Sequence, residues 1–213
     1  MSEMKQTAGV LFSGGKDSSL AALLLSKHYT IELNTFVFDL TAPVAAVRQA
    51  AETLGFIHHI RVLGRDVLDD LTQQIVSDGY PNHVINAAHL VAIEQMSKEY
   101  KVIGDGTRHG DRVPMLSSSE ISRLYDRDGC TYVRPLLGFP KPAIEYLCNR
   151  YLTVTYGETG TIENGDYERE IRNRLTDLNI EISELFPKHH MQSLVTASSW
   201  GKVSDANGSR EDQ

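Results

Sequence analysis

Six consecutive residues near the N-terminus, Ser13-Gly14-Gly15-Lys16-Asp17-Ser18, carry the groups needed to hold an anion. Adjacent glycines adopt backbone conformations closed to other residues, so successive N–H groups can turn towards one point. The hydroxyls of Ser13 and Ser18 and the ammonium of Lys16 add direct phosphate contacts. Asp17 repels phosphate, so it fits either as a ligand of Mg²⁺ beside the phosphate or as a cap for the following helix.

The sequence around this loop predicts how it is built. An apolar run at 9–12 precedes it and a helix-like run at 19–25 follows it. A strand, a turn and a helix in this order bring the unpaired N–H groups of the first helical turn to the anion. The Walker loop needs four residues between its glycines and the dinucleotide fingerprint needs G-x-G-x-x-G. Neither spacing occurs here, which indicates another kind of phosphate loop.

The six residues match the SGGxDS loop, and residues 7–178 resemble the PP-loop ATP pyrophosphatases. That superfamily includes GMP, NAD and asparagine synthetases and the tRNA lysidine and tRNA thiolation enzymes. The resemblance implies that ATP is cleaved between its α and β phosphates with Mg²⁺, which leaves pyrophosphate and an adenylylated acceptor. It also implies catalytic roles for Lys16 and Asp17. Adenine is expected at the end of the second strand, against Val37, Phe38 and Asp39.

Strand-like and helix-like segments alternate along the chain. Strands are predicted at 9–12, 31–39, 56–63, 101–104 and 131–137, and helices at 19–25, 43–54, 66–77, 82–99, from 117, and 140–151. This alternation predicts a doubly wound α/β fold, with a mostly parallel five-stranded sheet and helices on both faces. The resemblance implies the strand order 3-2-1-4-5. Ligands bind such sheets at the carboxyl edge, where the strand order reverses.

The composition is that of an ordinary globular protein: 213 residues, of which 41% are hydrophobic and 23% charged. We expect one domain over 1–197, in which 160–197 form a C-terminal helical extension, and a flexible tail over 198–213. The two cysteines fit a reducing cytosol. No apolar run is long enough to cross a membrane, and the first residues lack the core of a signal peptide. A cytoplasmic protein is expected.

A second polar segment, residues 104–112, follows the predicted strand at 101–104. Arg108 is predicted on the acceptor side, and Asp111 is predicted to be catalytic and to hold Mg²⁺ together with Asp17. The superfamily often carries GH-x-x-D-D here, whereas this chain has a longer spacing, one final aspartate, and Asp105 in place of the histidine. A solvated Gly/Asp turn is the alternative. The residues of this segment predicted to contact ATP are Gly104, Gly106 and Thr107.

Two further segments are assigned through the resemblance. Arg134 begins an R-P-L segment similar to that of the tRNA lysidine and thiolation enzymes, and it is predicted to be catalytic. Lys141, which begins the next helix, is placed on the acceptor side. Arg169 and Arg172 lie three residues apart on one helix face and are predicted to contact the acceptor. The alternatives are a plain surface arginine at 134, a solvated lysine at 141 and a salt-bridged helix around 169–172.

The histidines and cysteines predict little chemistry. Eight histidines are present. Some are neighbours in a strand and point to opposite faces, and others, such as His83 and His89, are spaced poorly for binding one metal ion. No C-x-x-C motif offers ligands for an iron–sulfur cluster. Cys148 is predicted to be a small buried residue, and Cys130 to be reactive only if it is exposed.

The predicted function is that of an ATP-dependent, AMP-forming enzyme in which ammonia, an amine or sulfide displaces AMP from the acceptor. Neither a glutaminase nor a tRNA-binding domain is recognisable, so we expect free ammonia or a nitrogen- or sulfur-donating partner protein. The expected acceptor is a small molecule or tRNA. Whether the chain forms a homo-oligomer is left open. A net charge of −7, from 21 basic and 28 acidic residues, weakens the tRNA alternative. Two alternatives remain: an ATP-binding regulatory protein of the universal-stress type, and a tRNA-modifying enzyme that requires a partner.

Overall fold

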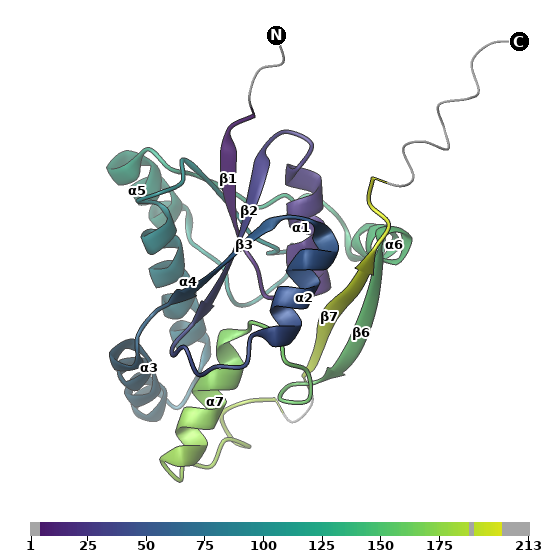
Figure 1. Cartoon of the computed structure of the whole chain (residues 1–213). Coiled ribbons are helices and arrows are strands. Elements are labelled where there is room, and N and C mark those ends of the chain that lie inside the picture. Colours follow the sequence, from purple (N-terminus) through teal and green to yellow (C-terminus); the bar gives the residue numbers. More distant parts are fainter. Residues whose placement is uncertain (1–4, 188–189, 202–213) are drawn as a thin grey trace, which may run out of the picture.

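The computed structural model describes residues 5–187 and 190–201. Its centre is a parallel five-stranded sheet with the order β3-β2-β1-β4-β5 (Figure 1). The strands are β1 (Thr7–Leu11), β2 (Thr30–Val37), β3 (Ile57–Val62), β4 (Val102–Gly104) and β5 (Thr131–Val133). The predicted fold class and strand order are confirmed. β5 ends earlier than predicted because Pro135 has no N–H for the ladder, and the Leu137 N–H closes a turn on the Arg134 carbonyl at 3.2 Å.

Helices cover both faces of this sheet. One face carries α1 (Lys16–Leu25), α2 (Ala45–Leu54) and α6 (Lys141–Tyr151), and the other carries α3 (Arg65–Asp78), α4 (Asn82–Met96), α5 (Ser118–Asp128) and α7 (Tyr167–Asp177). The alternation of side chains along β1 requires this, since Val10 packs on the α1 face and Leu11 on the α4 face. The helix predicted from residue 117 is α5, and Ser117 and Glu120 form a capping box at its start.

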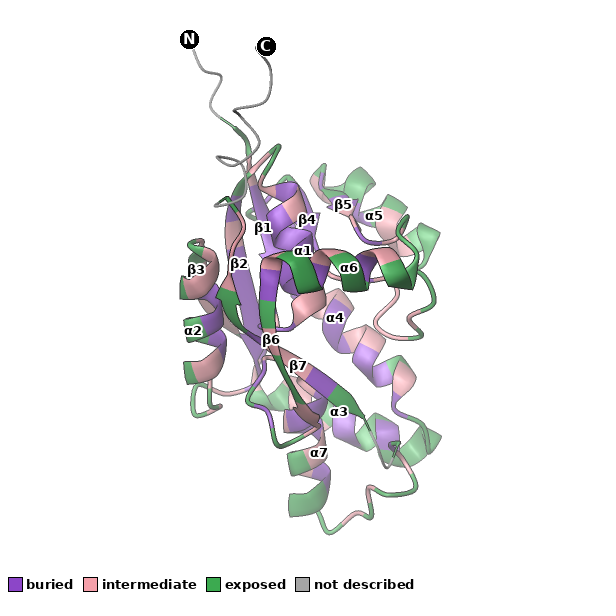
Figure 2. Ribbon diagram, turned by 90° about the vertical axis from the view of Figure 1, so that its right-hand side faces the viewer, coloured by how far each residue is buried: buried purple, intermediate pink, exposed green. Residues whose placement is uncertain are grey.

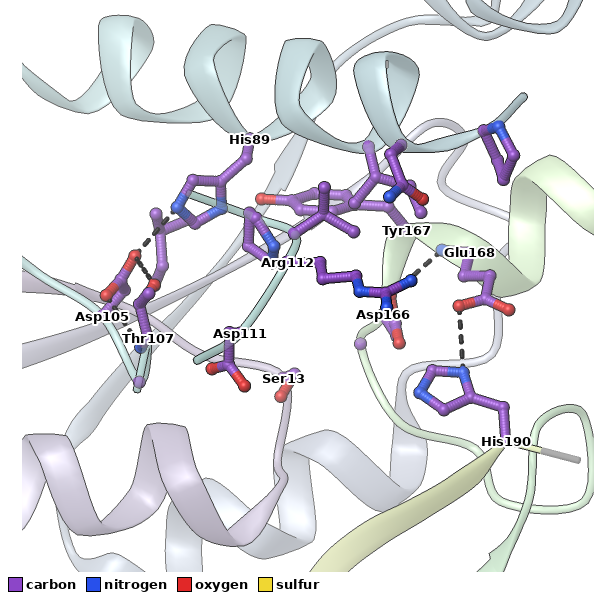
Figure 3. Close-up of a pocket in the computed structure, with 18 of the residues that line it drawn as sticks. Ser13, His89, Asp105, Thr107, Asp111, Arg112, Asp166, Tyr167, Glu168 and His190 are labelled. Carbon is purple, nitrogen blue, oxygen red and sulfur yellow. Dashed lines mark hydrogen bonds and ion pairs between the residues drawn. The ribbon is translucent and has the colours of Figure 1, made fainter. Parts of the chain in front are cut away.

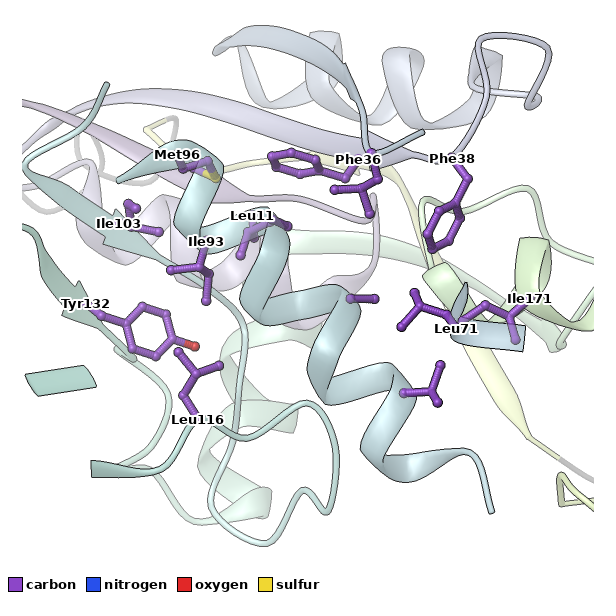
Figure 4. Close-up of a cluster of buried hydrophobic side chains, with 14 of the residues drawn as sticks. Leu11, Phe36, Phe38, Leu71, Ile93, Met96, Ile103, Leu116, Tyr132 and Ile171 are labelled. Atoms are coloured by element: carbon purple, nitrogen blue, oxygen red, sulfur yellow. The ribbon is translucent and has the colours of Figure 1, made fainter. Parts of the chain in front are cut away.

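Two apolar cores hold these layers together. The core beneath α4 contains Leu11, Phe36, Ile93 and Met96, all nearly or fully buried (Figure 4). Burying one such side chain contributes about 1.5–3 kcal/mol. Figure 2 shows that β1 and β2 are almost wholly buried, while the outer faces of the helices are exposed. The sheet edge that carries the loop after β1 is thus held on both sides. No helix in the described part of the chain is long and apolar enough to cross a membrane.

The C-terminal part differs from the predicted helical extension. β6 (Leu152–Glu158) and β7 (Met191–Ser198) form a separate antiparallel sheet, and α7 lies between them in sequence. Ser and Thr residues dilute the apolar alternation of β7, which is why its strand pattern is weak in the sequence. The ring of Trp200 packs 4.6 Å from that of Tyr151, so the chain is docked up to this residue. The rest of the predicted tail, from residue 202 on, lies outside the described residues.

Candidate functional site

A pocket of about 800 Å³ opens at the carboxyl edge of the sheet between β1 and β4, where the strand order reverses. Its walls come from the loop after β1, the loop after β4, the N-terminal half of α4, the residues around the start of α7, and residues 184–187 and 190 (Figure 3). The polar and charged lining residues most relevant here are Ser13, Asp17, Ser18, His89, Asp105, Thr107, Arg108, Asp111, Arg112, Asp166, Glu168 and His190.

The predicted phosphate loop forms one wall of this pocket. Helix α1 begins at Lys16, and its N-cap is Gly15, which has no side chain to bond the first turn. Asp17 therefore does not cap the helix, and that alternative is wrong. The loop is held by its own hydroxyls, since the Gly15 N–H donates to Ser13 Oγ at 3.3 Å and the Ser13 N–H to Ser18 Oγ at 3.4 Å.

Strand β7 fixes the same loop from outside. The Val195 N–H donates to the carbonyl of Gly14 at 2.9 Å, and the Lys16 N–H donates to Ser193 Oγ at 3.1 Å. A residue 177 positions away thus supplies the hydrogen bond that a capping side chain would make. No pattern in the sequence indicates this contact between Ser193 and the loop.

The loop after β4 packs closely on the phosphate loop. A Cβ on Gly106 would lie 2.5 Å from the backbone nitrogen of Ser18, so only glycine fits there. The segment before α7 forms a third wall, where the Gly165 N–H donates to the Ser13 carbonyl at 2.8 Å. Three segments far apart in sequence thereby meet around the start of α1.

Arg108 links the acids predicted to hold Mg²⁺. Its guanidinium lies 3.4 Å from Asp17 Oδ2 and 2.7 Å from Asp111 Oδ1, and the ammonium of Lys16 lies 2.7 Å from Asp17 Oδ1. The hydrogen bond to Asp111 raises the pKa of Arg108. No group of three or more His, Cys, Asp or Glu side chains among the described residues could hold a metal ion. Mg²⁺ at this point would therefore take part of its ligands from a bound phosphate.

A buried hydrogen-bond network lies behind the pocket wall. The carboxylate of Asp105 is 2.9 Å from His89 Nε2, accepts from the Thr107 hydroxyl at 2.9 Å, and accepts from the hydroxyl of Tyr132. Burial alone would raise the pKa of Asp105, but the bonds from His89, Tyr132 and Thr107 outweigh it and hold that pKa below its ordinary value. An acid with all these bonds has little capacity left for a metal. His89 did not stand out in the sequence, because it lies six positions from the nearest helical histidine, His83.

An acidic cluster lines the wall near α7. The carboxyl of Asp166 caps α7 through the Glu168 N–H at 3.1 Å and accepts from Gln192 at 2.7 Å, and burial raises its pKa. Glu168 accepts from Arg172 Nε at 2.7 Å. It also lies 3.1 Å from His190 Nδ1 (Figure 3). Its bond with Glu168 raises the pKa of His190. Sequence reasoning missed this cluster, whose members come from α7 and from the start of β7.

Residues 4–197 match the model of a family of unknown function, DUF7411. The chain belongs to that family. An uncharacterized protein of Methanocaldococcus jannaschii, MJ0690, is 36% identical over 187 residues, which cover 87% of this chain and 94% of the relative. The crystal structure described as a predicted subunit of tRNA methyltransferase from M. jannaschii is 34% identical, with a TM-score of 0.82, covering 91% of this chain and 97% of that one. An NH₃-dependent NAD synthetase from Campylobacter jejuni is 16% identical, with a TM-score of 0.46, covering 68% and 64% of the two chains, a likeness that supports no functional assignment.

In this DUF7411 chain, the residues expected to read adenine lie outside the large pocket. Val37 and Phe38 are buried, the Phe38 N–H donates to Glu170 Oε2 at 3.0 Å, and the Val37 carbonyl accepts from the Leu63 N–H at 2.8 Å. The carboxylate of Asp39 pairs with Arg65 and lines a separate pocket of about 330 Å³. The Phe38 N–H and the Val37 carbonyl, two of the backbone groups expected to bind the base, thus already have protein partners.

Arg134, which was predicted to be catalytic, and Lys141, which was predicted on the acceptor side, also lie away from the large pocket. Arg134 contacts Met115 Sδ at 3.1 Å and lies over the ring of Tyr132. The exposed ammonium of Lys141 lies 3.7 Å from Glu145 one turn along α6, as expected for a solvated first-turn residue. The solvated alternative therefore describes Lys141, and the catalytic role predicted for Arg134 finds no support in its position.

The arginines of α7 separate instead of meeting one substrate. Arg172 pairs with Glu168 at the large pocket, whereas Arg169 is buried, donates to the Pro43 carbonyl at 3.1 Å and lines the small pocket. The salt-bridged alternative describes Arg172.

Both cysteines, at 130 and 148, are buried, and burial raises the pKa of each thiol to about 11. Gly104 packs against α1, where a Cβ would lie 2.4 Å from Leu25 Cδ1, and it is not among the pocket residues.

Proposed function

We propose that this chain binds ATP in the large pocket and cleaves it to AMP and pyrophosphate. The observation that carries the proposal is the position of the SGGxDS loop: it forms the start of α1 and opens, through Ser13, Asp17 and Ser18, into a pocket of about 800 Å³ at the switch point of the sheet. A helix start of this kind favours the charge that develops on departing pyrophosphate.

The charged residues of the pocket are assigned by their positions. Lys16 and Arg108 lie at the mouth of the loop and neutralise phosphate oxygens. Arg112, an exposed residue of the pocket wall with no ion pair among the described residues, adds a third positive charge. Asp17 and Asp111 fit a Mg²⁺ ion that also binds phosphate, because both carboxylates line the pocket beside Arg108. Bound there, Mg²⁺ would supply charge neutralisation.

The acceptor oxygen attacks the α-phosphorus, pyrophosphate leaves along the loop, and the acceptor is left adenylylated. Because the Phe38 N–H already bonds Glu170, we propose that adenine lies against the aromatic and apolar lining on the α4 side, which includes Phe36, Tyr80 and Ile85. The description of the M. jannaschii relative as a tRNA methyltransferase subunit supports a tRNA acceptor and a partner protein. The net charge of −7 favours a small-molecule acceptor, or a partner that provides the basic surface.

Exchange of labelled pyrophosphate into ATP, together with AMP release, tests the proposal. The chain is incubated with Mg²⁺ and ATP and with carboxylates, nucleobases or bulk tRNA as acceptor, and ammonium or hydrosulfide as nucleophile. Acceptor-dependent exchange or AMP supports the proposal, and Asp17→Asn should abolish both while the fold remains. Tight ATP binding with ADP alone, or with no product under any condition, would instead identify a regulatory ATP-binding protein.

A further inference from the structure

His89 and Asp105 form a pair whose geometry resembles an oriented general base. His89 is 4% exposed and lines the large pocket from α4, and Asp105 follows β4 directly. Nε2 of His89 lies 2.9 Å from the Asp105 carboxylate, which is itself 3% exposed (Figure 3). Neither residue has a role in the phosphate chemistry proposed above.

The partners of Asp105 determine which ring nitrogen of His89 carries the proton. An ionised carboxylate only accepts hydrogen bonds, and Asp105 accepts from the hydroxyls of Tyr132 and Thr107 and from the Thr107 N–H. The close nitrogen of His89 must therefore be a donor, so the proton sits on Nε2. In the neutral ring, the lone pair then lies on Nδ1.

Nδ1 of His89 faces the pocket. Nδ1 has no hydrogen-bond partner within the described part of the chain. It is also not one of the described polar atoms that are fully buried without a partner, so a ligand can reach it. The ring of Tyr167 meets that of His89 edge-on at 6.2 Å and closes this side of the pocket. The His89 ring is thus held by Asp105, confined by Tyr167, and open to a ligand only at its basic nitrogen.

We propose that His89 accepts the proton of the nucleophile that displaces AMP, with Asp105 as the residue that positions its ring. This inference rests on the proposed function. An uncharged amine attacks the adenylylated carbon, a C–N bond forms, and the C–O bond to AMP breaks with its electron pair staying on AMP. The proton released from the amine nitrogen passes to Nδ1, and the adjacent Asp105 carboxylate stabilises the resulting imidazolium.

The nucleophile enters as the uncharged amine, and its attack leaves one proton in excess on the nitrogen that forms the new bond. Nδ1 of His89 takes this proton, so a single base on the pocket wall balances the step. Among the other acids of this wall, Glu168 is already paired with Arg172 and His190.

The tautomer is tested first, on the full chain labelled with ¹⁵N-histidine. Two-bond ¹H–¹⁵N spectra should show His89 with its proton on Nε2 and a bare Nδ1 at neutral pH, the signal being assigned by its loss in His89→Gln. In Asp105→Asn this single tautomer should be lost, since the amide can donate as well as accept. A proton on Nδ1 in the unmodified chain would overturn the proposal.

Kinetics then separate this inference from the proposed function. With ammonium as nucleophile, His89→Gln should reduce AMP release by about 100-fold and leave pyrophosphate–ATP exchange unchanged, because glutamine still donates to Asp105 but accepts no proton. The matched control, His28→Gln, makes the same substitution at an exposed histidine that does not line the pocket, and it should keep full activity. Unchanged AMP release in His89→Gln, or an equal loss in His28→Gln, rejects a base role for His89. Absence of exchange and of AMP in the unmodified chain rejects the proposed function and with it this step, while the spectra still report the tautomer.

Discussion

Arg108 holds Asp17 of the phosphate loop: its Nη1 lies 3.4 Å from Asp17 Oδ2, while Nη2 of the same guanidinium lies 2.7 Å from Asp111. Two carboxylates that would repel each other, and repel a phosphate, are thus neutralised together by one arginine. Since Arg108 is about one-third exposed, its guanidinium has room to turn towards an anion that enters the pocket.

Replacing Arg108 tests this arrangement. Arg108→Gln should weaken the binding of a non-hydrolysable ATP analogue with Mg²⁺ by about 10- to 100-fold, because a charge-assisted phosphate contact contributes about 1.5–3 kcal/mol. Titration calorimetry measures the dissociation constant. Arg123→Gln, on the exposed face of α5, removes the same charge far from the pocket and should have no effect. Equal affinities for both variants would remove Arg108 from the nucleotide site.

Gly106 controls how closely the loop after β4 approaches α1. In Gly106→Ala the new Cβ would lie 2.5 Å from the Ser18 nitrogen, so the backbone must shift at a cost of about 1–3 kcal/mol in unfolding free energy. The same shift should weaken binding of the ATP analogue. Gly138→Ala is the matched control, because nothing lies within 4 Å of its Cβ. Urea unfolding and calorimetry measure both effects, and a stable, tightly binding Gly106→Ala would contradict the close packing.

Ser193 should stabilise the phosphate loop although it lies in β7. Ser193→Ala leaves the Lys16 N–H without its partner and should lower the unfolding free energy by about 1 kcal/mol, as loss of a helix cap does. Thr196→Ala, on the exposed side of the same strand, should cost little. Urea unfolding of the two variants side by side gives the difference, and equal stability would show that the Ser193 bond contributes nothing.

His58 should make the fold sensitive to acid. Burial, with the nearby charges of Arg48 and His59, lowers the pKa of His58 from the ordinary 6.5 to about 4, and its Nδ1 is buried without a partner. Between these values the unfolded chain binds a proton that the folded chain does not. Stability therefore falls as the pH drops from about 6.5 to about 4, and the His58 contribution does not change further below that range.

The size of this effect is roughly 1–2 kcal/mol, less than the full shift implies because the ring is only half-buried. Unfolding free energies measured at several pH values should show a weaker acid loss in His58→Gln than in the unmodified chain. His28→Gln, which changes an exposed histidine, should follow the unmodified chain. Identical slopes for all three proteins would contradict the buried, neutral state of His58.

The sheet and the strand–turn–helix conformation around residues 13–18 could be predicted because their signals are local. Apolar runs alternating with helical periodicity predict the order of the elements, and residues 13–18 are one continuous motif between β1 and α1. The adenine site predicted at the end of β2 took no account of Glu170. This residue, 132 positions later, bonds the Phe38 N–H, and no local pattern indicates that contact.

The unpredicted site residues all depend on tertiary contacts of this kind. His89 can be recognised as a site residue only because β4 places Asp105 beside it. Ser193 can be recognised only because β7 docks on α1. The one available sequence signal for His89 would have been the order of α4 and β4, because a helix that packs on the next strand brings His89 close to the residue after that strand, Asp105. Arg134, in contrast, carried a recognisable segment but turns towards Met115, since a motif fixes a position in the chain and not the direction of a side chain.

The docking of Ser193 and Val195 on the phosphate loop has a consequence for biosynthesis. The ribosome makes Gly14 and Lys16 well before the strand that holds them. A nascent polypeptide that stops before residue 193 carries the whole 13–18 loop without the bonds from β7 that shape it. We therefore expect that chains stalled at residue 190 bind no ATP analogue, while chains that include residues 193–195 do.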